Sequence, residues 1–123
     1  MVKATAGEGL ARIRAEIERE KAEALGRAGA RLAEAIKALR LLRDEVEALE
    51  AGRATPADLP DAGEAATRRR AEYAALLREA QRQHHYLIVQ REALGFRKHG
   101  DVDRLYPVPG PLRASRAGGG ETP

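Results

Sequence analysis

Apolar residues recur at the spacing of an α-helix over much of the chain, and this pattern restricts the possible folds more than any other feature. From Leu25 to Leu49 the steps between large apolar residues are mostly three, four or seven positions, which places most of them on one face of a helix. A similar pattern returns after a short segment that holds one glycine and two prolines, residues that interrupt helices. The sequence therefore predicts two long helices, at residues 8–50 and 62–94, joined by a connection at residues 51–61.

The composition agrees with an all-α domain built as an antiparallel helical hairpin. Charged residues make up 33% of the chain and aromatic residues only 3%, so the core must consist of aliphatic and small side chains. Two long helices joined by a short connection pack antiparallel. We expect one helical domain at residues 8–113, in which the proline-rich residues 95–113 fold back as a strap. Residues 1–7 are expected to be flexible, and residues 114–123 to be disordered.

The run Tyr86-Leu87-Ile88-Val89 cannot be covered by one neighbouring helix. Successive helical positions lie about 100° apart, so four apolar residues in a row extend most of the way around the helix. In the hairpin, Leu87 and part of Ile88 face the first helix, whereas Tyr86 and Val89 point away from it. Either the strap or a second copy of the chain covers them. We expect both, with a homodimer that forms a four-helix bundle.

Two glycines near the middle of the first helix allow two interpretations. Gly26 and Gly29 each cost about 1 kcal/mol relative to alanine inside a helix, so the helix could break there. Alternatively, the two glycines form a flat groove that accepts the bulky run from the second helix. Folding the hairpin at its connection places Leu87 near Ala28, and we therefore expect the groove.

Arg91 follows the apolar run and is expected on the same seam. Its functional interpretation is a pocket that binds an anion. Its structural interpretation is a partly buried ion pair with Glu23 or Glu20 that fixes how the two helices align. We expect the ion pair.

A row of basic side chains on the second helix raises the possibility of nucleic-acid binding. The net charge is +3, and the row has no interleaved aromatic residues of the kind that stack on bases. Acidic residues also interrupt it, so a solvated helical face is the simpler interpretation. The residues of this row are Arg68, Arg69, Arg70, Arg78 and Arg82.

Catalysis, cofactor binding and membrane insertion find no support in the sequence. The chain has no cysteine, its one serine is Ser115, and no glycine-rich phosphate-binding motif occurs. The three histidines lack the spacing of a metal site within one chain. No apolar stretch is long enough to cross a membrane. We expect a cytoplasmic protein that is not an enzyme and holds no metal or cofactor.

Two segments resemble a family of small bacterial helical proteins known only as a domain of unknown function. These are EREKAEALGRAGARLAEAIKAL at residues 18–39 and YLIVQREALGFRKHGDVDRLYPVP at residues 86–109. Phe96 stands where the family pattern has leucine. The resemblance implies a helical fold in which both segments matter, and it implies no chemistry.

Together these observations predict a helical interaction or scaffold module that binds other protein chains and forms a homodimer. The alternative is a weakly basic accessory protein that binds nucleic acid through the row of arginines.

Overall fold

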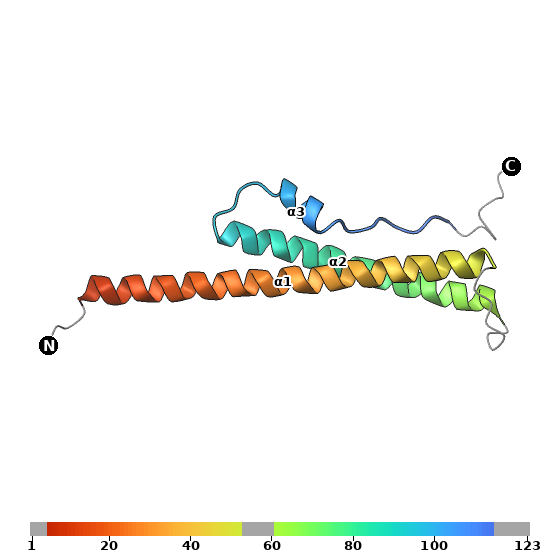
Figure 1. The fold of residues 1–123 in the computed structure, drawn as a ribbon, viewed down its shortest axis with the longest axis horizontal. Helices are drawn as coiled ribbons and strands as arrows, with labels where there is room; N and C mark the ends of the chain where they lie inside the picture. Colours follow the sequence, from red (N-terminus) through yellow and green to blue (C-terminus); the bar gives the residue numbers. More distant parts are fainter. Residues whose placement is uncertain (1–4, 53–60, 115–123) are drawn as a thin grey trace.

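The computed structural model describes residues 5–52 and 61–114. Within these ranges the chain forms three helices, α1 (Ala6–Glu50), α2 (Ala62–Ala93) and α3 (Gly100–Leu105), and no strand. α1 and α2 pack antiparallel along one another (Figure 1). This confirms the predicted all-α helical hairpin. Most of the predicted flexible start, connection and disordered tail lies outside the described residues.

A capping box starts α1 slightly earlier than the sequence analysis predicts. The hydroxyl of Thr5 accepts a hydrogen bond from the backbone nitrogen of Glu8, at 3.1 Å, and the Glu8 carboxylate accepts one from the backbone nitrogen of Thr5, at 3.3 Å. These bonds satisfy backbone donors that a helix start leaves free. The helix therefore begins at Ala6 rather than at residue 8. At the start of α2, Asp61 caps the helix through the backbone nitrogen of Glu64.

The two glycines do not break α1, and they do not form the predicted groove. Gly26 is exposed, and an added Cβ atom there would meet nothing within 4 Å. Gly29 is buried, but the side chain against it is Tyr106 of the C-terminal segment, not the apolar run of α2. The groove prediction is wrong because it assumed that α2 covers both glycines, whereas the returning chain covers one and leaves the other open.

The core lies between the middle and C-terminal part of α1 and the facing side of α2. It is aliphatic apart from Tyr73, as the composition predicts, and the expected neighbours Ala28 and Leu87 both belong to it. Burial of these apolar side chains is the main contribution to the stability of the hairpin. The buried residues of this cluster are Ala28, Leu32, Ala35, Ile36, Leu39, Tyr73, Leu77, Ala80, Leu87 and Val102.

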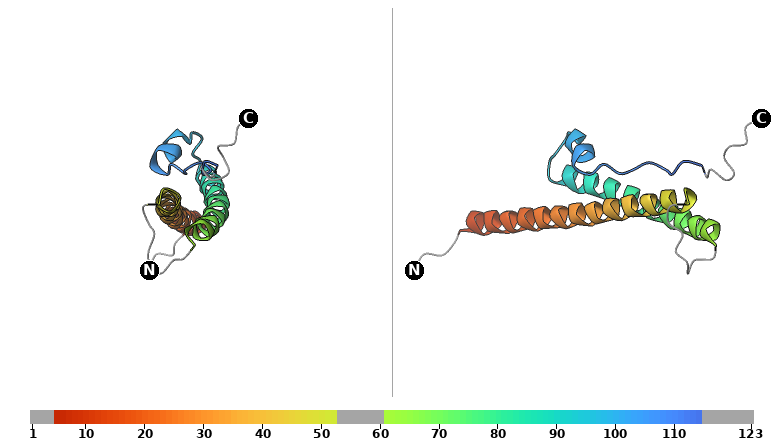
Figure 2. Two further views of the ribbon diagram at one scale, coloured as in Figure 1. Left: turned by 90° about the vertical axis from the view of Figure 1, so that its right-hand side faces the viewer. Right: turned by 45° about the vertical axis from the view of Figure 1, so that its right-hand side comes forward.

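After α2 the chain turns back and runs along the hairpin, so that α3 and the extended segment after it form a third layer (Figures 1 and 2). Gly95 makes the turn with a φ of 96°, a left-handed conformation that suits glycine. In the structure the strap comprises residues 96–114, one residue later at each end than the predicted 95–113. It buries Val102, and its Tyr106, Val108 and Leu112 pack against the core.

Two hydrogen bonds from α2 fasten the extended part of the strap. The hydroxyl of Tyr73 donates to the backbone oxygen of Gly110, at 2.7 Å, and Arg70 donates to the backbone oxygen of Arg113, at 2.6 Å. The cap position of α3 is His99, without a side-chain capping bond, and the carboxylate of Asp101 in its first turn accepts a hydrogen bond from Arg91.

Candidate interaction surfaces

The first part of α1 extends beyond the end of α2 (Figure 1). α1 has 45 residues and α2 has 32, so α2 cannot accompany α1 over its full length. Residues 6–24 are called the arm. Three large apolar side chains of the arm, Leu10, Ile13 and Ile17, are exposed by 50%, 54% and 44%. They are called the arm stripe, and an exposed apolar group of this kind marks a candidate binding surface.

Leu10 and Ile17 of the arm stripe continue the face of α1 that is buried in the hairpin. Ile13, eighteen residues before the exposed Arg31, lies at the edge of that face. Leu10, Ala28 and Val46 are eighteen residues apart, which corresponds to five turns of a helix with about 3.6 residues per turn. Ala28 and Val46 are only 2% and 1% exposed. Ile17 stands in the same relation to Ala35, which is 8% exposed. The face that is buried in the hairpin is therefore left open on the arm.

The sequence analysis did not select the arm stripe as a binding surface. A signal for it was present, because the two predicted helices, residues 8–50 and 62–94, already differ in length. An antiparallel partner that is shorter than α1 must leave one end of α1 uncovered. The side chains at that end are large and apolar, which distinguishes the arm from an ordinary solvated helix end.

The apolar run on α2 divides as the sequence analysis predicts. Leu87 is 3% exposed and Ile88 is partly buried against the core. Tyr86 and Val89 are 47% and 44% exposed. The strap does not cover these two side chains, so they form a second exposed apolar surface, on the outer face of α2.

Arg91 does not pair with Glu23. Its guanidinium donates to the Asp101 carboxylate at 3.1 Å, to the backbone oxygen of Lys98 at 3.1 Å and to Nδ1 of His99 at 3.3 Å. It also lies 4.4 Å from the centre of the Phe96 ring, a cation–π contact.

The prediction for Arg91 chose the wrong partner because Arg91 lies on the side of α2 that faces the strap, and Glu23 is exposed on α1. Arg91 is a structural residue, 13% exposed in its side chain, that holds the turn after α2. Because its guanidinium already binds Asp101, Lys98 and His99, Arg91 does not form the anion pocket considered as the alternative.

Carboxylates neutralise most of the basic row on α2. Arg68 pairs with Glu64 at 3.4 Å, Arg69 with Glu45 and Glu72 at 2.9 Å each, and Arg82 with Glu79. Arg70 binds both carboxylate oxygens of Glu50, at 2.6 and 2.9 Å, and this hydrogen bonding raises the pKa of Arg70. Arg78 is exposed. The row is thus a set of ion pairs rather than a free basic surface for phosphates.

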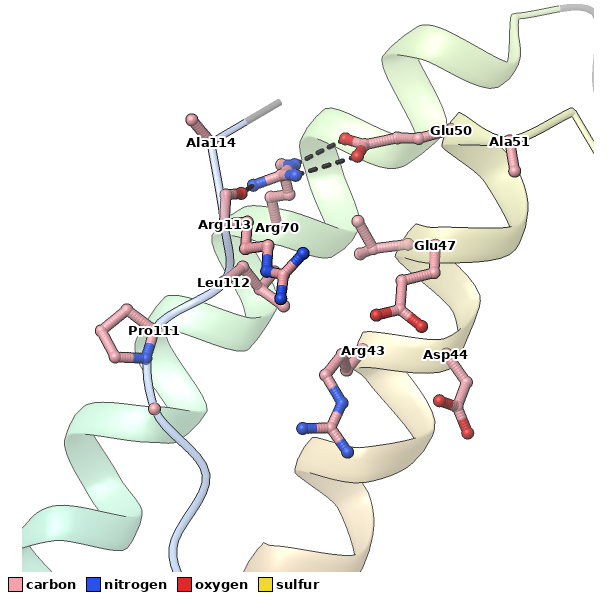
Figure 3. A pocket seen from close by; sticks show the side chains of 12 residues that line it. Arg43, Asp44, Glu47, Glu50, Ala51, Arg70, Pro111, Leu112, Arg113 and Ala114 are labelled. Carbon is pink, nitrogen blue, oxygen red and sulfur yellow. Dashed lines mark hydrogen bonds and ion pairs between the residues drawn. The ribbon is translucent and has the colours of Figure 1, made fainter. Parts of the chain in front are cut away.

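A hollow of about 720 Å³ lies between the end of α1, α2 and the last residues of the strap (Figure 3). Figure 3 shows the Arg113 side chain extending from the strap toward α1. The lining includes the cationic side chains Arg43, Arg70 and Arg113 and the acidic side chains Asp44, Glu47 and Glu50. Because the two sets balance in number, the hollow offers no net positive charge to an anion.

The histidines help to hold the strap. Nε2 of His84 lies 3.0 Å from the Asp103 carboxylate, and Nε2 of His99 lies 3.5 Å from the Glu92 carboxylate. In residues 5–52 and 61–114, no three histidine or acidic side chains gather where they could bind one metal ion. The same residues contain no helix that is both long and apolar enough to cross a bilayer.

Comparison with family models, curated proteins and solved structures found no match to this chain. The resemblance to a bacterial helical family therefore stays a prediction based on the two segments, residues 18–39 and 86–109.

Proposed function

We propose that the protein is a helical interaction module that binds other protein chains through the arm. One observation carries this proposal. The apolar face of α1 is buried at Ala28 and Ala35 but continues without cover onto Leu10 and Ile17, exposed by 50% and 44%. Amphipathic helices bind one another through such faces.

The outer face of α2 is a second candidate surface. The exposure of Tyr86 and Val89 supports the predicted homodimer with a four-helix bundle, in which this face would meet a second copy. Ion pairs such as Arg82–Glu79 lie on the same helix, so contact there would have to accommodate charged neighbours. For this reason the arm, with its longer apolar face, is the better supported surface.

The test compares what the protein captures before and after the arm stripe is disrupted. We expect the double variant Ile13→Glu, Ile17→Glu to lose every specific partner that the wild-type chain retains on an affinity column. Ala15→Glu, Ala22→Glu is the matched control, because it adds the same two charges to the exposed opposite side of the arm. Identical sets of captured proteins from all three chains would contradict the proposal.

Nucleic-acid binding remains the alternative, although the ion pairs of the basic row reduce its support. A size-exclusion peak with an ultraviolet absorbance ratio typical of nucleic acid would favour it. The variant in which Arg68, Arg69 and Arg78 become glutamine should then lose the nucleic acid and keep its fold, because it leaves the structural Arg70 in place. A peak free of nucleic acid favours the interaction module.

A further inference from the structure

The arm needs a covering helix that the described part of this chain does not supply. α2 ends at Ala93, and the turn at Gly95 directs the following residues back along the hairpin, away from the arm (Figure 1). A helix that covers the arm stripe would lie end to end with α2, and the described residues of this chain place none there.

Steric clashes limit the direction in which the arm of a second copy can run along the first arm. If a second copy ran parallel to the first, both copies would bring α2 to the same face of α1 from Ala28 onward. That face is already closed within each hairpin, where Ala28 is 2% exposed, so the two bodies would collide. If the second copy runs antiparallel, its arm covers the first arm while the two hairpins lie at opposite ends.

The spacing of the arm stripe is nearly symmetric, which suits such a pair. Leu10 lies three residues before Ile13 and Ile17 lies four residues after it, distances of about 4.5 and 6 Å along the helix. A two-fold axis through Ile13 places each Leu10 opposite Ile17 of the other copy and each Ile13 opposite its counterpart. All three apolar side chains of both copies are then buried in one closed interface.

We propose that the arm binds the arm of a second copy, antiparallel, about a two-fold axis through Ile13. The inference rests on the proposed function, because it names one partner of the arm. It differs from the four-helix bundle, which would join copies through Val89 and the outer face of α2.

The charges that flank the arm stripe give this dimer a distinctive salt dependence. At about 100° per residue, Arg14 and Lys21 lie along one edge of the stripe, where Lys21 pairs with Glu18 at 3.8 Å. Glu16 and Glu20 lie along the other edge. A two-fold axis across antiparallel helices brings each edge against the same edge of the partner. Arg14, next to the axis, therefore meets its own counterpart, and added salt strengthens the dimer by screening this repulsion.

Sedimentation equilibrium over a range of concentrations tests these statements. We expect the wild-type chain to dimerise, and to do so more tightly at 0.5 M than at about 0.05 M salt, where screening is weaker. Ile13→Glu should weaken the dimer by about 100-fold or more, because it buries an unpaired charge. Arg14→Gln should tighten the dimer by about two- to five-fold and reduce the salt dependence. Val89→Glu is the control and should leave the dimer unchanged.

Cross-linking tests the direction of the arms, and the chain has no native cysteine to interfere. When Leu10→Cys chains are mixed with Ile17→Cys chains and oxidised, an antiparallel pair yields the mixed disulfide as the main product. Leu10→Cys mixed with Ala15→Cys is the matched control and should cross-link poorly. A parallel pair would instead link each variant to itself.

Three outcomes would overturn the inference: a monomer at all concentrations, a dimer lost in Val89→Glu but kept in Ile13→Glu, or self-linked Leu10→Cys chains as the main product. The proposed function fails separately, when Ile13→Glu, Ile17→Glu captures the same proteins as the wild type. If the protein is monomeric and its captured partners depend on the arm stripe, the dimer is refuted and the proposed interaction module is supported.

Discussion

Gly26→Ala and Gly29→Ala add the same methyl group to α1 at positions three residues apart, yet we expect them to change stability in different ways. Alanine is better than glycine inside a helix by about 1 kcal/mol at either position. At Gly26 nothing lies within 4 Å of the added carbon. Gly26→Ala should therefore raise the free energy of unfolding by about 0.5–1 kcal/mol.

At Gly29 the added carbon would lie 2.5 Å from the hydroxyl oxygen and 3.2 Å from the Cζ atom of Tyr106, so the tyrosine ring has to move. Overpacking of this kind costs about 1–3 kcal/mol, which offsets or exceeds the gain in helix propensity. The free energy of unfolding of Gly29→Ala should thus fall about 1–3 kcal/mol below that of Gly26→Ala.

Urea denaturation followed by circular dichroism measures both variants, and a third substitution identifies the cause. Tyr106→Phe removes the hydroxyl group that would lie closest to the new methyl group. Gly29→Ala should therefore cost less in the Tyr106→Phe background than in the wild type, with a coupling energy of about 0.5–2 kcal/mol. Equal stabilisation by Gly26→Ala and Gly29→Ala, with no coupling to Tyr106, would refute the close approach of the strap to α1.

Three further predictions concern contacts of α2. Arg91→Ala removes the hydrogen bonds and the ring contact that hold the turn after α2, and should lower the free energy of unfolding by about 2–3 kcal/mol. A change below about 0.5 kcal/mol in urea denaturation would contradict the structural role of Arg91. Arg70→Ala breaks a partly buried two-point ion pair and should lower the free energy of unfolding by about 1–3 kcal/mol. Arg82→Ala breaks an exposed pair and should lower it by less than about 0.5 kcal/mol. Equal losses would contradict the effect expected from the difference in burial. Burial raises the pKa of Tyr73, so its neutral hydroxyl stabilises the fold fully below the ordinary tyrosine pKa of about 10. That contribution is lost as the pH rises through the folded value, and wild-type stability should therefore fall more steeply above pH 10 than that of Tyr73→Phe; parallel pH profiles would show that this titration is not linked to folding.

The sequence was sufficient for the hairpin because helical periodicity acts locally. The steps from Leu25 to Leu49 and the burial of Leu87 with the exposure of Tyr86 and Val89 follow from the angle between successive residues. The boundaries of α2 follow from Asp61 at its start and from Gly95 after its end. These features need no knowledge of the rest of the chain.

The partners of Gly29 and Arg91 could not be predicted in the same way. Both residues contact the strap, and the path of an irregular segment with several prolines depends on many weak contacts rather than on a repeating pattern. With only two facing helices considered, the expected ion-pair partner of Arg91 is Glu23 on α1. Its actual partner, Asp101, lies closer along the chain. The fold was predictable from periodicity, whereas the contacts made by the strap were not.

The capping box at Thr5 and Glu8 has a consequence for how the arm exchanges its amide hydrogens. Most of the stability of a helix in a protein comes from tertiary packing, and most residues of the arm are exposed. The folded hairpin fixes one end of the arm, and the capping box is the weaker restraint at the other end. The helix of the arm should therefore fray from the capped end inward. Amide protection should therefore rise along α1 from the arm to the hairpin, and a binding partner on the arm stripe should remove this gradient.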